Sequence, residues 1–128
     1  MYITQRKSCF LPLSVADEGG FWPTGFNTNE EPIAILTEAI KLAGYKPMED
    51  VAIALDIASS EFYNNETGSY ELKLENKTLS REELVDMLCM WTEKYPIVSI
   101  EDGCSELDWE GWQLLTKKLG GKIQLIGD

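Results

Sequence analysis

The chain has 128 residues, 44% of them hydrophobic, which is enough for one domain with its own core. Its formal net charge of −11 argues against nucleic acid or an anionic membrane as a partner, because both bind through a basic surface. It has no histidine, which excludes a Ser-His-Asp or Cys-His nucleophile and most zinc sites within these residues. Three cysteines without paired spacing favour a reducing, cytoplasmic location.

The first residues carry no helical pattern. Residues 1–16 are therefore expected to form one or two extended stretches. The apolar segment at residues 9–13 follows two basic residues, as in a very short signal peptide, but Pro12 interrupts it, so an extended segment entering a turn is the stronger interpretation. No apolar run is long enough for a membrane span. The next segment, residues 17–20, is Asp-Glu-Gly-Gly, and paired glycines let a ligand approach the main chain closely.

A helix and then a hairpin are predicted in the first half of the chain. Apolar spacing predicts the helix from about residue 30, with Asn29 as its N-cap and Gly44 after its last turn. Its expected core face carries Ile33, Leu36, Ile40 and Ala43. Turn residues at 64–68, followed by alternating residues at 70–74, predict a small inserted hairpin.

Two further helices are expected in the second half. Ser80 and Glu83 form a capping box for the first of them. Trp91 and the methionines are expected in the core rather than at a ligand. Ser105 and Asp108 offer a second box, which predicts the start of the last helix.

Three short apolar runs alternate with these elements, and each is followed by an acid. Residues 51–55 lead to Asp56, residues 97–100 to Glu101, and residues 123–127 to Asp128. Runs of this length rich in Val and Ile are typical of buried parallel strands, so the chain is predicted to be α/β with repeated βα units. The carboxyl ends of parallel strands share one rim, where three acids would repel one another unless a cation lies between them. Asp and Glu without His or Cys favour Mg²⁺.

Several interpretations of these acids stay open on spacing alone. A single acid after a strand is commonly no more than a polar residue at the start of a loop. Three together fit either a barrel or a receiver-like domain that binds Mg²⁺ and accepts a phosphoryl group on Asp56. The receiver-like domain needs a lysine at the same rim. Lys117, Lys118 and Lys122 all precede the last apolar run, which disfavours it.

Longer motifs resemble one family in their order and spacing. They are DEGGF at residues 17–21, ALDIASSEFY at 54–63, YPIVSIEDG at 95–103 and IQLIGD at 123–128. These segments look like enolase (phosphopyruvate hydratase), specifically a fragment of its C-terminal barrel domain from a bacterial-like branch. The resemblance implies an α/β fold that is part of a (β/α)8 TIM-type barrel, with about three βα units and an inserted hairpin.

The resemblance also implies a reaction and its residues. The reaction is the Mg²⁺-dependent dehydration of 2-phosphoglycerate to phosphoenolpyruvate, a lyase step of glycolysis carried out by a cytoplasmic homodimer. Asp56, Glu101 and Asp128 match the carboxylate ligands of the catalytic Mg²⁺, and Glu18 matches the substrate-binding proton donor that helps the hydroxyl depart. The family's general base is a lysine on a later barrel strand, so none of these 128 residues supplies it. The chain alone is expected to be inactive.

The chain also departs from the family pattern. Residues 1–14 form a divergent N-terminal segment, and residues 15–128 form the partial barrel domain. Ala16 and Trp22 replace the usual Gly and Ala beside the paired-glycine motif. Because a full barrel takes about 250 residues, this one would keep open strand edges. A non-catalytic enolase-like protein that binds or assembles through those edges is the alternative function.

Overall fold

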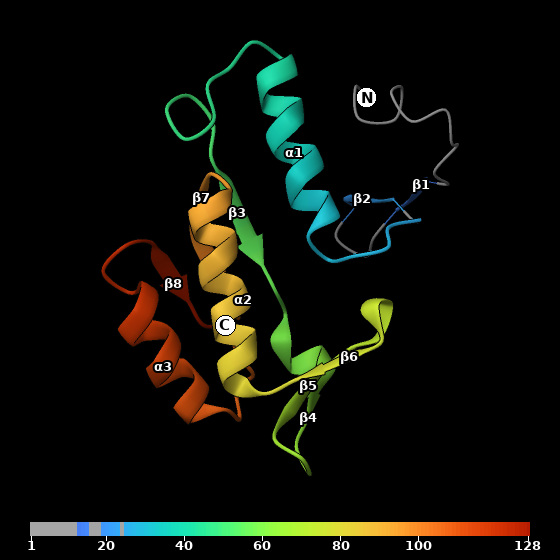
Figure 1. Ribbon diagram of the computed structural model, residues 1–128. Helices are drawn as coiled ribbons and strands as arrows, with labels where there is room; N and C mark the ends of the chain where they lie inside the picture. The colour runs from blue at the N-terminus through green and yellow to red at the C-terminus, as the bar shows by residue number, and fades with distance from the viewer. Residues whose placement is uncertain (1–12, 16–18, 24) are drawn as a thin grey trace.

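The computed structural model describes residues 13–15, 19–23 and 25–128 (Figure 1). Its first elements are β1 (Leu13–Val15) and β2 (Phe21–Pro23), which pair as an antiparallel ribbon near the start of the first helix. Residues 1–12, which hold most of the signal-like segment, and Glu18 lie outside the described residues. Their predictions therefore rest on the sequence.

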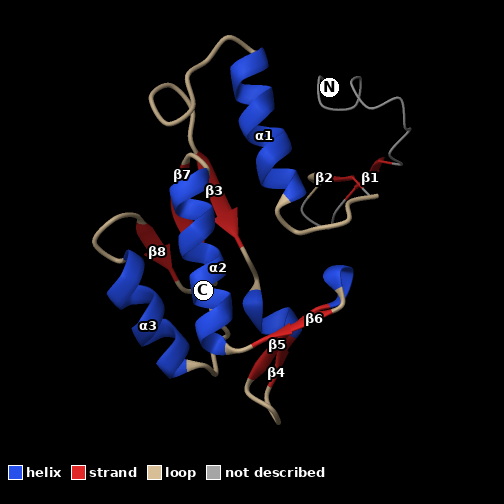
Figure 2. Cartoon of the chain, viewed as in Figure 1, coloured by secondary structure: helices blue, strands red, loops and turns tan. Residues whose placement is uncertain are grey.

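Three parallel strands form the sheet on which the acidic residues lie (Figure 2). They are β3 (Ile53–Asp56), β7 (Ile97–Glu101) and β8 (Gln124–Ile126), in the order β3-β7-β8. All three predicted strands are present, and the first and last are shorter than their apolar runs. Val51 makes only an isolated bridge to Pro47, so β3 begins two residues after it.

Two helices cover one face of this sheet. Helix α2 (Arg81–Lys94) lies against β7, and α3 (Trp109–Leu119) lies beside it against β8 (Figure 1). Both helices and the sheet contribute fully buried side chains to one core: Leu84, Leu88, Ile97, Ile100, Leu115 and Leu119. Burying an aliphatic side chain stabilises a fold by roughly 1.5–3 kcal/mol, so this cluster contributes strongly to the stability of the fold.

The starts of these two helices differ in one respect from the sequence prediction. The capping box at α2 is confirmed, since Ser80 Oγ accepts from Glu83 N and Glu83 Oε2 accepts from Ser80 N. The box predicted at Ser105 is wrong. Asp108 is itself the N-cap of α3, and its Oδ1 accepts a hydrogen bond from Gly111 N at 3.0 Å. Ser105 instead belongs to the preceding turn, where its carbonyl accepts from Asp108 N.

Helix α1 (Glu31–Leu42) lies alongside β3. The prediction that Asn29 caps it is wrong, because the N-cap is Glu30 and makes no side-chain cap bond. Asn29 is drawn away by a distant partner: its main-chain N and its Nδ2 each donate to Glu75 Oε1 at 3.0 Å. Gly44 follows the helix with φ +88° as predicted, whereas Leu36 on the expected core face is 43% exposed.

A small antiparallel sheet is inserted between β3 and α2. It consists of β4 (Tyr63–Asn64), β5 (Ser69–Leu72) and β6 (Lys77–Leu79) in that order (Figure 2). The predicted hairpin is confirmed as β4-β5, but the third strand was not foreseen. Its segment lacks an alternating apolar pattern, and it is held by pairing with β5 rather than by burial.

Trp91 and the methionines were predicted together in the core, but they differ in how far the structure buries them. Trp91 is buried at 4% exposure, as predicted, while Met90 is 48% exposed. Their neighbouring positions on α2 face in different directions, which places one of them toward solvent. Among the described helices, none is both long and apolar enough to cross a bilayer.

Candidate active site

The parallel register places the strand-end acids along one rim. Asp56 pairs with Glu101 across β3 and β7, and Glu101 pairs with Ile126 across β7 and β8. Asp128 lies two residues beyond Ile126, the last residue of β8, so it comes at the same rim. Ala54 precedes Asp56 by two residues on the same face of β3, and both are exposed. Neighbouring strands lie about 4.8 Å apart, which brings the three acids into one region.

The carboxylates themselves are not gathered around a point. Asp56 Oδ1 accepts from Ala58 N at 3.1 Å, so this side chain turns back onto its own loop. In the described part of the chain, no three Asp, Glu, Cys or His side chains form a group that could hold a metal ion. Three carboxylates on one rim have the donor chemistry that Mg²⁺ requires, but they would have to move closer together to share one ion.

The lysines considered for a receiver-like site lie elsewhere. Lys117 and Lys118 are in the last turn of α3, which leads into β8 and therefore lies at the opposite end of the sheet from the acids. Lys118 Nζ forms an ion pair with Asp86 of α2. This placement agrees with the sequence argument against a phosphoryl-accepting site.

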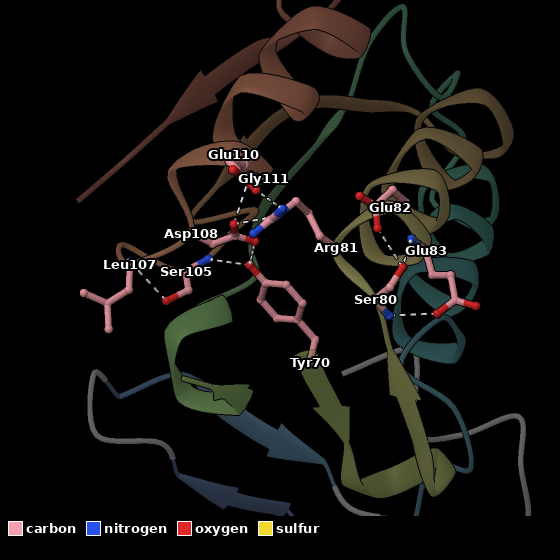
Figure 3. A network of polar contacts seen from close by, with 10 residues as sticks. All are labelled: Tyr70, Ser80, Arg81, Glu82, Glu83, Ser105, Leu107, Asp108, Glu110 and Gly111. Carbon is pink, nitrogen blue, oxygen red and sulfur yellow. Dashed lines mark hydrogen bonds and ion pairs between the residues drawn. The ribbon is translucent and has the colours of Figure 1, made fainter. Parts of the chain in front are cut away.

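A buried polar network beneath the rim was not predicted (Figure 3). The Tyr70 hydroxyl, on β5, donates to Asp108 Oδ2 at 2.8 Å and accepts from Ser105 N at 3.1 Å. Arg81 Nε donates to Asp108 Oδ1 at 2.6 Å, and Arg81 also pairs with Glu110. Burial raises the pKa of Tyr70 far above its ordinary value of 10.0, so this hydroxyl stays protonated as a donor.

This network joins the inserted sheet to the starts of α2 and α3. Cys104 lies beside it at 1% exposure, and burial, with the Asp108 charge as a second cause, raises the pKa of its thiol to about 12. Such a thiol is inert at neutral pH. Sequence spacing could not reveal the network, because it joins distant residues: Tyr70 and Asp108 are 38 positions apart in the sequence.

A pocket of about 430 Å³ opens between α1, α2 and the inserted sheet. Ile33, Leu55 and Trp91 form part of its apolar wall, and three acids with one lysine stand around it: Asp56, Glu61, Glu71 and Lys73. This excess of negative charge does not suit a phosphorylated substrate. A phosphate bound there would need a cation beside it.

Comparison with known proteins gives the same family. The family model described as the enolase C-terminal TIM barrel domain matches residues 2–128. The chain is 67% identical to Enolase 1 of Desulfitobacterium hafniense over 122 residues, which cover 95% of this chain and 28% of that protein. It is 59% identical to enolase of Nitratiruptor over 117 residues (91% and 27%), and 60% identical to enolase of Wolinella succinogenes over 115 residues (90% and 27%).

These matches confirm the predicted fold class, an α/β segment of a TIM barrel with an inserted antiparallel sheet. The chain spans about a quarter of the length of the curated relatives it matches, 27–28% of each. The match to the family model runs across residue 14, and the division of the chain at that position stays a prediction.

Proposed function

The chain belongs to the enolase family as a segment of its C-terminal TIM barrel domain, and on this premise we propose that it carries the acidic half of an enolase active site. In this proposal Asp56, Glu101 and Asp128 hold Mg²⁺, and Glu18 donates the proton to the departing hydroxyl of 2-phosphoglycerate. Bound Mg²⁺ would stabilise the negative charge that grows on the substrate carboxylate when the neighbouring proton is removed.

One observation supports the proposal most strongly. The three strands that end in acids are neighbours in a single parallel sheet, and Asp56 lies directly opposite Glu101 in the register. If the acids were unrelated loop residues, there would be no reason for their three strands to be neighbours in the order β3-β7-β8. The carboxyl rim of such a sheet is where α/β barrels bind their ligands.

Magnesium binding tests the metal site directly. Titration of the 128-residue chain with MgCl₂, followed through its amide resonances, is expected to shift the signals of Asp56, Glu101 and Asp128. Asp56→Asn should abolish these shifts. Glu49→Gln is the matched control, since it removes one exposed carboxylate from the loop that leads into the opposite end of β3. Equal shifts in wild type and Asp56→Asn would refute the assignment.

A second part of the proposal concerns activity. The 128 residues lack the family's catalytic lysine, so we expect no phosphoenolpyruvate from 2-phosphoglycerate in a coupled assay with saturating Mg²⁺. A full-length bacterial enolase serves as the positive control. Measurable turnover by the chain would show that the predicted inactivity is wrong, whether or not the chain binds Mg²⁺ in the titration.

The sheet edges favour assembly as the second candidate function. Within the described residues, β3 and β8 are the outer strands of the parallel sheet, and each pairs on one side with β7. Open strand edges can pair with another chain. Sedimentation at several concentrations is expected to show self-association. A concentration-independent monomer would argue against both edge pairing and the predicted homodimer.

A further inference from the structure

The residue after Glu101 connects all three strand ends. Asp102 N donates to Ile126 O at 3.0 Å, which continues the β7-β8 ladder. On the other side, Asp102 O accepts from Ser59 N at 3.1 Å, in the loop that follows Asp56. The Asp102 side chain makes a third bond, in which Oδ1 accepts from Asp128 N at 3.0 Å.

The third bond replaces one that a regular ladder would contain. In parallel pairing, a residue that donates its N–H to one neighbour accepts at its own carbonyl from the residue two positions further along the same strand. Asp102 donates to Ile126, so its carbonyl would ordinarily accept from Asp128 N. Here the carbonyl points to Ser59 instead, and the side-chain oxygen takes its place.

The backbone conformation of Asp102 makes this exchange work. Its φ is +46°, in the left-handed region, which turns the carbonyl from β8 toward β3. Asp and Asn tolerate this region better than other residues that carry a side chain. Glycine would adopt the left-handed region more easily, but it has no side-chain oxygen to accept a hydrogen bond from Asp128 N. Both requirements, the left-handed turn and the acceptor, are met by Asp or Asn.

We propose that Asp102 is a positioning residue for the acidic rim, because its side chain holds Asp128 while its turned carbonyl holds the loop after Asp56. In this role Asp102 fixes the positions of Asp56 and Asp128 on either side of Glu101, and it is not itself a metal ligand. The role in positioning rests on the proposed function of the rim as a Mg²⁺ site, whereas the hydrogen bonds exist independently of it.

Three variants separate the parts of this proposal. Asp102→Asn keeps both the turn and an acceptor oxygen, whereas Asp102→Gly keeps the turn and removes the acceptor. Asn76→Gly is the matched control, because Asn76 also has a left-handed backbone (φ +50°) and lies in the connection between β5 and β6. The readouts are amide hydrogen exchange at each backbone N–H and the Mg²⁺ dissociation constant of the 128-residue chain.

Asp102→Gly is expected to speed exchange at the Asp128 amide about tenfold, while the amides of Asp102 and Ser59 stay protected. It should also weaken Mg²⁺ binding several-fold. Asp102→Asn and Asn76→Gly should match wild type in both measurements. Rescue by asparagine distinguishes positioning from a charge effect of Asp102 on the cation.

Four results would overturn the proposal. Unchanged protection of the Asp128 amide in Asp102→Gly would show that the Asp102 side chain does not protect this amide. Faster exchange of this amide with unchanged Mg²⁺ affinity would confirm the hydrogen bond but show that it does not position the Mg²⁺ ligands. Loss of affinity in Asp102→Asn equal to that in Asp102→Gly would make charge the cause. If wild type binds no Mg²⁺, the metal site fails as the proposed function and the positioning role fails with it, while the exchange data still decide the bond.

Discussion

The Tyr70 hydroxyl is the most informative single group to remove from this fold. Tyr70→Phe deletes one oxygen and keeps the ring, which is fully buried and packs against Phe62 and Tyr63 at centroid distances of 5.9 and 4.9 Å. The ring contacts and the apolar burial should therefore survive. What is lost is the donor to Asp108 and the acceptor for Ser105 N.

The cost follows from those two bonds. A hydrogen bond to a charged group contributes about 1.5–3 kcal/mol, and a buried N–H left without a partner costs about 1–3 kcal/mol. Because the two effects share one site and are not additive, we expect a loss of about 3 kcal/mol in the free energy of unfolding. Small domains are stable by about 5–15 kcal/mol, so this is a large fraction.

Urea unfolding followed by tryptophan fluorescence measures this loss. Tyr63→Phe is the matched control, since it removes a hydroxyl from the neighbouring, half-buried ring and leaves the Asp108 network intact. Its expected effect is within about 0.5 kcal/mol. A loss below about 1 kcal/mol for Tyr70→Phe, or equal losses in both variants, would refute the assignment of the network as a main link between the inserted sheet and the helices.

Three further changes test other parts of the fold. Gly103→Ala would place a methyl group 2.7 Å from a buried leucine of α3, so we expect a loss of about 1–3 kcal/mol in urea unfolding, against no loss for Gly121→Ala, where nothing lies within 4 Å. Cys104, with its pKa raised to about 12, should resist iodoacetamide in the native chain and react after unfolding, as peptide mass spectrometry would show. Glu30→Gln should destabilise the fold at neutral pH. The hydrogen bond from Lys94 and then that from Tyr95 lower the pKa of Glu30 below 4.5, so its contribution is present above that pH and disappears as pH falls through the lower folded-state pKa.

Each of these expectations has a result that would contradict it. Equal stability of the Gly103 and Gly121 variants would mean that the α3 leucine can move aside at no cost. Rapid labelling of native Cys104 would show that the loop after β7 opens readily. A stability difference between Glu30→Gln and wild type that persists at acidic pH would assign the effect to packing rather than to charge.

Features that depend on neighbours along the chain were predictable from the sequence alone. The Ser80 capping box, the helical stripe of α2 and the apolar runs that end on Asp56 and Glu101 are all read from spacings of a few residues, and the structure contains them. Periodicity of this kind reports which side of an element faces the core, and the same physics operates in the folded chain. The family resemblance rested on the same short motifs and is confirmed.

Contacts between groups that are far apart in the sequence depend on the tertiary fold. Asn29 was expected to cap α1, but a carboxylate 46 residues later binds it. Asp108 was placed inside a local box, although it is the N-cap and also the acceptor for Tyr70 and Arg81. A polar side chain chooses among all donors that the fold brings within about 3 Å, and spacing does not reveal those that arrive from other elements. For the same reason the acids were predicted at the rim, while the turned carbonyl of Asp102 that links their strands emerged only from the fold.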